Sequence, residues 1–73
     1  MKLSVVEKNR GGDVIRKTVI DTSLIAMVEW SSYQNPKEKA IRIWTSSMFS
    51  ISVEEKRHNY DDVEKELTTL GWL

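Results

Sequence analysis

The stretch Lys39–Glu54, KAIRIWTSSMFSISVE, decides how the rest of this chain is arranged. Apolar residues occupy every second position on both sides of the serine pair at Ser46 and Ser47, and a period of two is that of a β-strand. The stretch therefore predicts a β-hairpin. Its register remains to be decided, because a slip of one residue would exchange the two faces of each strand.

The length of the connecting loop sets this register. A loop made of the serine pair alone would place Arg42 opposite Ile51, on the apolar side of the hairpin. A three-residue loop, which adds Met48, gathers the apolar residues on one face and turns Arg42 and Trp44 outward. Burial favours the longer loop, although no glycine supplies the positive φ that tight hairpins prefer. The inward residues would then be Ile41, Ile43, Thr45, Phe49, Ile51 and Val53.

Length and composition limit what the protein can be. Its 73 residues predict a single domain, residues 1–73, with a core so small that such domains often rely on a disulfide, a metal or a partner subunit. The chain has no cysteine, which removes disulfides and thiolate metal sites and makes self-association the most available support. Formal net charge is zero, which disfavours general binding to nucleic acid. No apolar run has signal-peptide or membrane-spanning length, so we expect a cytoplasmic protein without membrane contact.

Three more strands are expected before the hairpin. The first is centred on Leu3–Val6, and the second covers residues 14–20 after a glycine-containing turn. Asp21 or Ser23 can then accept a bond from a nearby backbone N–H and support a single helical turn. The third strand, from Leu24 to Trp30, is apolar on both faces, as expected of a central strand or one that meets another chain. One face would carry Leu24, Ala26, Val28 and Trp30, and the other Ile25, Met27, Glu29 and Tyr33.

A helix is expected at the C-terminal end. Asn59 suits the N-cap, Asp61 and Asp62 suit the positive end of the helix dipole, and Gly71 stands where a left-handed C-cap belongs. Apolar residues at helical spacing can cover a sheet. They are Tyr60, Val63, Leu67 and Leu70.

These elements predict an α+β fold, in which a small antiparallel meander sheet of four to five strands has one C-terminal helix packed on one face. The exposed face and an edge strand would be free for contacts. The expected core consists of Leu3, Val5, Val28, Ile41, Ile43, Phe49, Ile51, Val53, Val63, Leu67 and Leu70.

The sequence contains no arrangement typical of catalysis. His58 is the only histidine and lies in a charged connector without a nucleophile beside it, which favours a solvated or helix-capping role over catalysis or metal binding. Asp61 and Asp62 point in different directions on a helix and form no carboxylate pair. We therefore expect no enzymatic activity, no metal, no cofactor and no small-molecule substrate.

The tryptophans offer a better guide to function than the titratable residues. Trp and Arg are enriched where binding energy is concentrated, so Trp44 beside Arg42 is a candidate binding patch, with partial burial at the sheet edges as the alternative. The sequence predicts a small non-enzymatic protein-binding module, an adaptor, regulator or inhibitor, that binds another protein or forms a homodimer. Its candidate binding residues are Arg42, Trp44, Met48, Tyr33 and Met27.

A second function from another class is binding of single-stranded nucleic acid. Trp44 and Trp30 would stack on bases, while basic side chains would contact phosphates. The neutral net charge disfavours it. The basic residues concerned are Arg10, Arg16, Lys17 and Arg42.

Four segments of the chain also follow one another in a familiar order. They are LIAMVEW from Leu24, AIRIWT from Ala40, FSISVEE from Phe49 and DDVEKEL from Asp61. This order resembles that of short flagellar proteins of the FlbD or SwrD kind, and the strand pattern is similar to that of LytTR-type DNA-binding domains. The resemblance spans Ile20 to Leu67. It implies an architecture of strands followed by a helix and assigns no functional residue.

Overall fold

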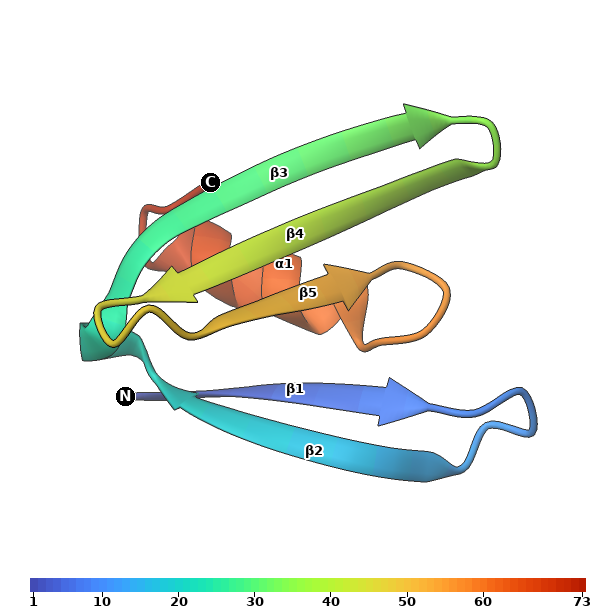
Figure 1. Ribbon diagram of the computed structural model, residues 1–73, viewed down its shortest axis with the longest axis horizontal. Coiled ribbons are helices and arrows are strands. Elements are labelled where there is room, and N and C mark those ends of the chain that lie inside the picture. Colours follow the sequence, from blue (N-terminus) through green and yellow to red (C-terminus); the bar gives the residue numbers. More distant parts are fainter.

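The computed structural model describes residues 1–73 and contains five strands and one α-helix, all strand pairs being antiparallel (Figure 1). This confirms the α+β class. The strands form two sheets, one of β1 and β2 and one of β3, β4 and β5 in that order. The elements are β1 (Lys2–Lys8), β2 (Val14–Asp21), a 3₁₀ turn η1 (Thr22–Leu24), β3 (Ile25–Gln34), β4 (Lys37–Thr45), β5 (Ser50–Glu54) and α1 (Tyr60–Thr69).

The hairpin of β4 and β5 has the register that burial favours. Arg42 lies opposite Ser52, and the N–H of Thr45 donates to the carbonyl of Phe49 over 2.8 Å, which leaves a three-residue loop. Its last residue, Met48, has a φ of 66°. A three-residue loop commonly ends in a left-handed residue. Methionine here takes a position usually given to glycine.

The core lies between the three-stranded sheet, β1 and α1, which passes behind β4 and β5 in Figure 1. We call the covered side of this sheet the inner face. Phe49 was expected in the core but is 49% exposed, because it precedes β5 and lines an open groove between β5 and the β1–β2 hairpin. Leu70, at the helix end, is only half-buried. The buried apolar residues are Leu3, Val5, Ile20, Ile25, Ile41, Ile43, Val53, Tyr60, Val63 and Leu67.

A bulge at the start of β3 changes the predicted faces of that strand. Ile25 lies opposite Thr45 and Met27 opposite Trp44, so Ala26 is an extra residue. Such an insertion interrupts the alternation of side chains. The prediction that Ile25 shares a face with Met27 is therefore wrong: Ile25 is buried, while Met27 is 46% exposed.

The helix ends as predicted. Gly71 has a φ of 89°, and the N–H of Trp72 donates to the carbonyl of Leu67 over 2.8 Å, which is a Schellman C-cap. Before the sheet, η1 is the expected helical turn, with Asp21 accepting from the N–H of Ser23 at 3.1 Å. α1 is neither long nor apolar enough to cross a membrane.

The helix begins directly after Asn59, as predicted, but without the expected capping bond. Asn59 precedes α1, but its side chain makes no capping bond. Its Oδ1 accepts from the N–H of Val6 at 2.8 Å, and its Nδ2 donates to the carbonyl of Ser4 at 3.0 Å. The N–H of Lys8 also donates to the carbonyl of Arg57 at 2.9 Å. Asn59 thus holds the predicted N-cap position, but its side chain bonds the outer edge of β1 in place of the helix.

Candidate protein-binding surface

The side of the three-stranded sheet opposite α1 is uncovered, and we call it the outer face. Residues directly opposite one another in paired strands point to the same side of a sheet. Because Ile41 and Ile43 point inward, the residues that alternate with them, Arg42 and Trp44, point outward. The outer face contains Met27, Glu29 and Tyr33 from β3, Arg42 and Trp44 from β4, and Ser50 and Ser52 from β5.

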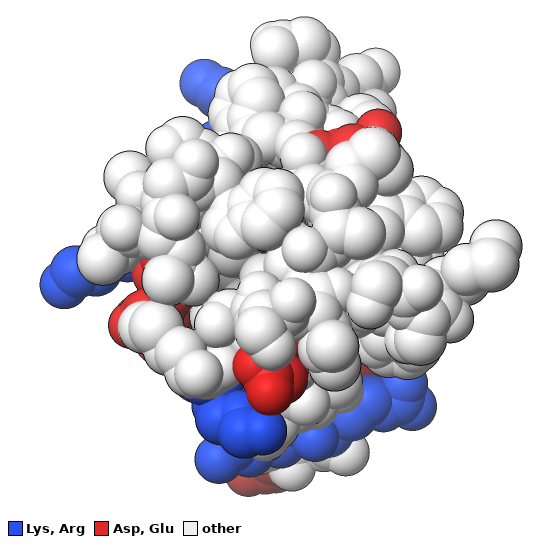
Figure 2. Space-filling view, turned by 90° about the vertical axis from the view of Figure 1, so that its left-hand side faces the viewer, with Lys and Arg blue, Asp and Glu red and all other residues white.

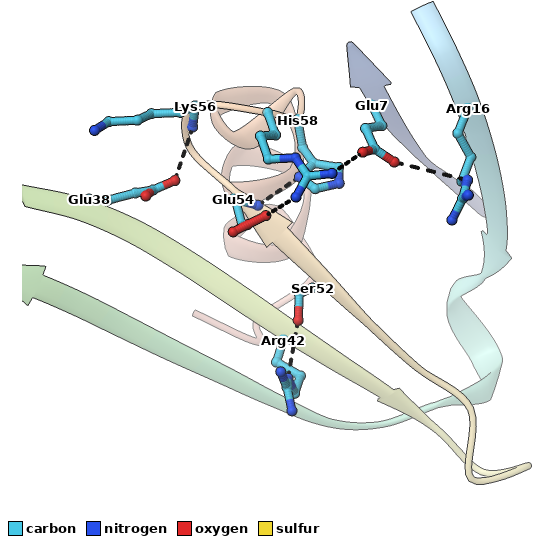
Figure 3. Close-up of polar contacts among 9 residues, drawn as sticks. Glu7, Arg16, Glu38, Arg42, Ser52, Glu54, Lys56 and His58 are labelled. Atoms are coloured by element: carbon cyan, nitrogen blue, oxygen red, sulfur yellow. Dashed lines mark hydrogen bonds and ion pairs between the residues drawn. The ribbon is translucent and has the colours of Figure 1, made fainter. Parts of the chain in front are cut away.

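A connected group of side chains holds the centre of the outer face. The Nε1 of Trp44 donates to Oε1 of Glu29 at 2.9 Å, and the guanidinium carbon of Arg42 lies 5.8 Å from the centre of the Trp44 ring. Figure 3 shows the bond from Arg42 Nε to Ser52 Oγ, 3.2 Å long, which joins β4 to β5. The polar atom of the indole is thus satisfied within the sheet. Its ring has neighbours on β3 and β4, and Ser52 of β5 holds Arg42.

The structure brings together four of the five residues predicted for binding. Met27 lies opposite Trp44, and Tyr33, opposite Glu38, borders a shallow hollow of about 270 Å³ that Arg42 also lines. Met48 is the exception. It lies in the hairpin loop beyond the end of the face and is 89% exposed.

Apolar side chains continue from the outer face onto the end of the molecule that carries this loop. Figure 2 views that end and shows a surface made mostly of uncharged residues, with Lys and Arg gathered along its lower margin. The N–H of Ser46 donates to the carbonyl of Leu24 at 2.8 Å, which fixes η1 beside the loop. Leu24, like Phe49, is 49% exposed.

A separate ionic network joins the connector after β5 to the β1–β2 hairpin. Figure 3 shows Glu7 between two guanidinium groups. Arg57 is hydrogen-bonded to Glu7 Oε2, and Arg16 Nε lies 3.9 Å from Oε1. The hydrogen bond from Arg57 lowers the pKa of Glu7, and the same bond raises the pKa of Arg57. With its side chain only 12% exposed, Glu7 serves as a structural ion-pair partner.

His58 belongs to the same connector and supports the turn rather than the helix. Its ring Nδ1 accepts from the backbone N–H of Glu54 at 2.9 Å. The backbone N–H of His58 donates to the carbonyl of Glu54, also at 2.9 Å. It lines the groove of about 280 Å³ between β5 and the β1–β2 hairpin. No group of three or more His, Asp or Glu side chains is placed to hold a metal ion.

The residues proposed for nucleic-acid binding are not assembled into one site. Trp30 lies opposite Ile41, on the inner side, and its Nε1 donates to the hydroxyl of Tyr60 at 2.8 Å. Trp44 is on the outer face. Arg16 and Lys17 lie on β2, in the other sheet, where Arg16 is paired with Glu7. The two candidate stacking platforms therefore lie on opposite sides of the three-stranded sheet.

Sequence reasoning named three residues without finding the roles that they have at the surface of this protein. Glu29 fixes Trp44, Trp30 marks the outer edge of β3, and Asn59 covers the edge of β1. Only Glu29 had a usable signal, because it falls on the same strand face as Met27. No family model, curated protein or solved structure matches the chain. The resemblance to short flagellar proteins and to LytTR-type domains stays a prediction.

Proposed function

We propose that the protein is a small non-enzymatic binding module, an adaptor, regulator or inhibitor of the cytoplasm, which binds another protein or a second copy of itself. The observation that carries this proposal is the uncovered outer face, with Trp44 at its centre. Because α1 covers one side of the three-stranded sheet, the other side is available to a partner.

The chemistry of the face supports this use. Aromatic residues, Met and Arg are enriched at the centres of protein interfaces. The outer face supplies all of these in Trp44, Tyr33, Met27 and Arg42. Because Trp44 is already held by Glu29, little side-chain freedom is lost when a partner covers it. Zero net charge provides no long-range steering, so binding would depend on burial at short range.

The test compares the double variant Arg42→Ala, Trp44→Ala with the wild type immobilised as bait in an extract of the native host. We expect captured proteins to be lost or to bind at least roughly 30-fold more weakly, the usual result of truncating a central hot spot. The control is Lys65→Ala, Glu66→Ala, which changes two exposed residues of α1. Unchanged capture by the first variant, with an unchanged far-UV spectrum, would refute the assignment of this face.

A titration with mixed-sequence single-stranded oligonucleotide tests the competing class. Because Trp30 and Trp44 lie on opposite sides of the sheet, we expect no change in tryptophan fluorescence at low salt. A saturable change that disappears at high salt would favour nucleic-acid binding instead.

A further inference from the structure

The outer edge of β3 has no partner within the chain. β4 uses Thr45 and Lys39 for its bonds to β5, so the intervening even-numbered residues of β4 face β3. Because backbone groups alternate in direction along a strand, the even-numbered residues of β3 then point away from β4. No hydrogen bond within the chain reaches the backbone N–H or carbonyl groups of these residues from outside the sheet. They are Val28, Trp30, Ser32 and Gln34.

The other edges of the two sheets are protected, and that of β3 is not. Arg57 and Asn59 cover β1, the short β5 faces the β1–β2 hairpin across the groove, and β2 presents Arg16 and Lys17. β3 is ten residues long, contains no proline, and has one charged residue, Glu29, which is bonded to Trp44. Natural proteins normally blunt a long edge of this kind with charges, prolines or bulges. The single bulge of β3 lies at its first residues and leaves the rest open.

We infer that this edge pairs antiparallel with β3 of a second copy of the chain, which joins the three-stranded sheets of both copies into one. This inference rests on the proposed self-association and names the surface that makes it. The charges favour a second copy: the chain has zero formal net charge, and β3 itself has only one charged side chain. Two such edges meet without repulsion, whereas a strongly charged strand would find no complementary charge on β3.

The residues of β3 select one register for this pairing. A two-fold axis at Glu29 would oppose two carboxylates, and one at Val28 would require pairing through the bulge. An axis at Trp30 instead places the two Trp30 side chains together, Met27 opposite the partner's Tyr33, and Glu29 opposite the partner's Ser31. An axis at Ser31 would lose both apolar contacts. The axis at Trp30 therefore buries the most apolar surface without opposing like charges.

Trp30 itself supports this position of the axis. Its indole is held by the bond to Tyr60, yet the residue is 50% exposed although it points to the inner side of the sheet. The helix leaves Trp30 half exposed at the edge of β3. A second Trp30 across the axis would cover that half, because directly opposed side chains have Cβ atoms about 5 Å apart.

The first experiment measures the oligomeric state by sedimentation equilibrium for the wild type and for Ser32→Pro. The N–H of Ser32 points away from β4, so proline there removes a bond to the second copy and none within the sheet. We expect a wild-type dimer whose association weakens roughly tenfold or more in Ser32→Pro, because the symmetric pairing loses two hydrogen bonds. Lys17→Pro is the matched control, since its N–H points out from the edge of β2, and it should leave the dimer intact.

The second experiment uses the absence of cysteine in the chain, which makes any introduced thiol unique. Glu29 and the partner's Ser31 form a non-hydrogen-bonded pair in the proposed register, with Cα atoms about 4.5 Å apart, a distance that a disulfide can span. We expect a mixture of Glu29→Cys and Ser31→Cys proteins to form a covalent dimer on mild oxidation, and either protein alone to form little.

Three results would overturn the inference in distinguishable ways. A monomeric wild type would refute the dimer, while the outer face could still bind another protein. A dimer insensitive to Ser32→Pro and without the mixed cross-link would leave self-association standing but refute the β3 edge. Efficient cross-linking of Ser31→Cys alone would move the axis to Ser31 and refute the register. Loss of capture in Arg42→Ala, Trp44→Ala reports on the outer face alone.

Discussion

The outer edges of β1 and β3 pose the same problem and have different solutions. At β1, the connector that returns to the helix passes alongside, and Asn59 bonds both Ser4 and Val6. At β3, the corresponding backbone groups meet no other part of the chain. The difference shows that this small fold does cover an edge where its chain path allows. An open edge elsewhere is therefore a surface available for pairing, and four measurements can test the contrast.

Hydrogen exchange of the two edges should show the largest difference. We expect the amides of Val6 and Lys8 to exchange only on global unfolding, and those of Trp30 and Ser32 to exchange freely in dilute solution. For a domain stabilised by about 3–5 kcal/mol, the rates should differ by roughly a hundredfold or more. Protection of Trp30 that rises with protein concentration would support the dimer. Equal protection of both edges at high dilution would contradict the contrast.

Opening the β1 edge should have the next largest effect. Asn59→Ala removes two bonds and leaves the N–H of Val6 and the carbonyl of Ser4 without partners, so we expect a loss of about 2–3 kcal/mol in the free energy of unfolding, measured with urea. Asn9→Ala is the matched control, because Asn9 makes a single exposed bond to the N–H of Asp13. A cost for Asn59→Ala no greater than that of the control would show that the edge needs no cover.

The ionic network beside β1 predicts a pH dependence. Because the bond from Arg57 holds the pKa of Glu7 below its ordinary value of 4.5, the unfolded chain binds this proton more readily than the folded one. The stabilisation is complete above pH 4.5 and is lost as the pH falls through the folded pKa of Glu7. Urea unfolding of Glu7→Gln should show a weaker decline in this acid range than the wild type or Glu66→Gln. An identical decline of the unfolding free energy in Glu7→Gln and the wild type would exclude Glu7 as a source of the pH dependence.

The smallest effect concerns the link between β3 and the helix. Burial raises the pKa of Tyr60 to about 12, so the stabilisation from its protonated hydroxyl is complete below pH 10 and is lost as the pH rises from 10 to about 12. Tyr60→Phe should remove this loss of stability at alkaline pH. In a Tyr33→Phe background, phenolate absorbance should show a midpoint near 12. A midpoint near 10 would mean that Trp30 and Tyr60 are open to water.

The sequence was most informative where burial alone decides the outcome. Alternation on both sides of Ser46 and Ser47 predicted the β4–β5 register and hence the outward direction of Arg42 and Trp44. The bulge at Ala26 could not be predicted, because one inserted residue leaves no mark in a strand that is apolar on both faces. Nor could the limits of the outer face be predicted, since Met48 stands close to Trp44 in the sequence but lies in the loop beyond this face.

Asn59 shows a different limit of sequence reasoning. The same amide can cap a helix or bond a strand edge, and the residues before a helix favour the local use. The competing partners, Ser4 and Val6, are 55 and 53 positions away in the chain. Which use prevails depends on the open edge of β1, and that edge exists only in the folded molecule.

The same sequence separations have a consequence for the kinetics of folding. Each strand pair joins neighbours in the chain and can close a short hairpin, whereas the bonds of Asn59 close nearly the whole chain. The entropic cost of loop closure grows with loop length, so these bonds form after the hairpins have docked. Interactions absent from the transition state act on the unfolding rate. Asn59 thus governs how long the folded state lasts far more than how quickly it is reached.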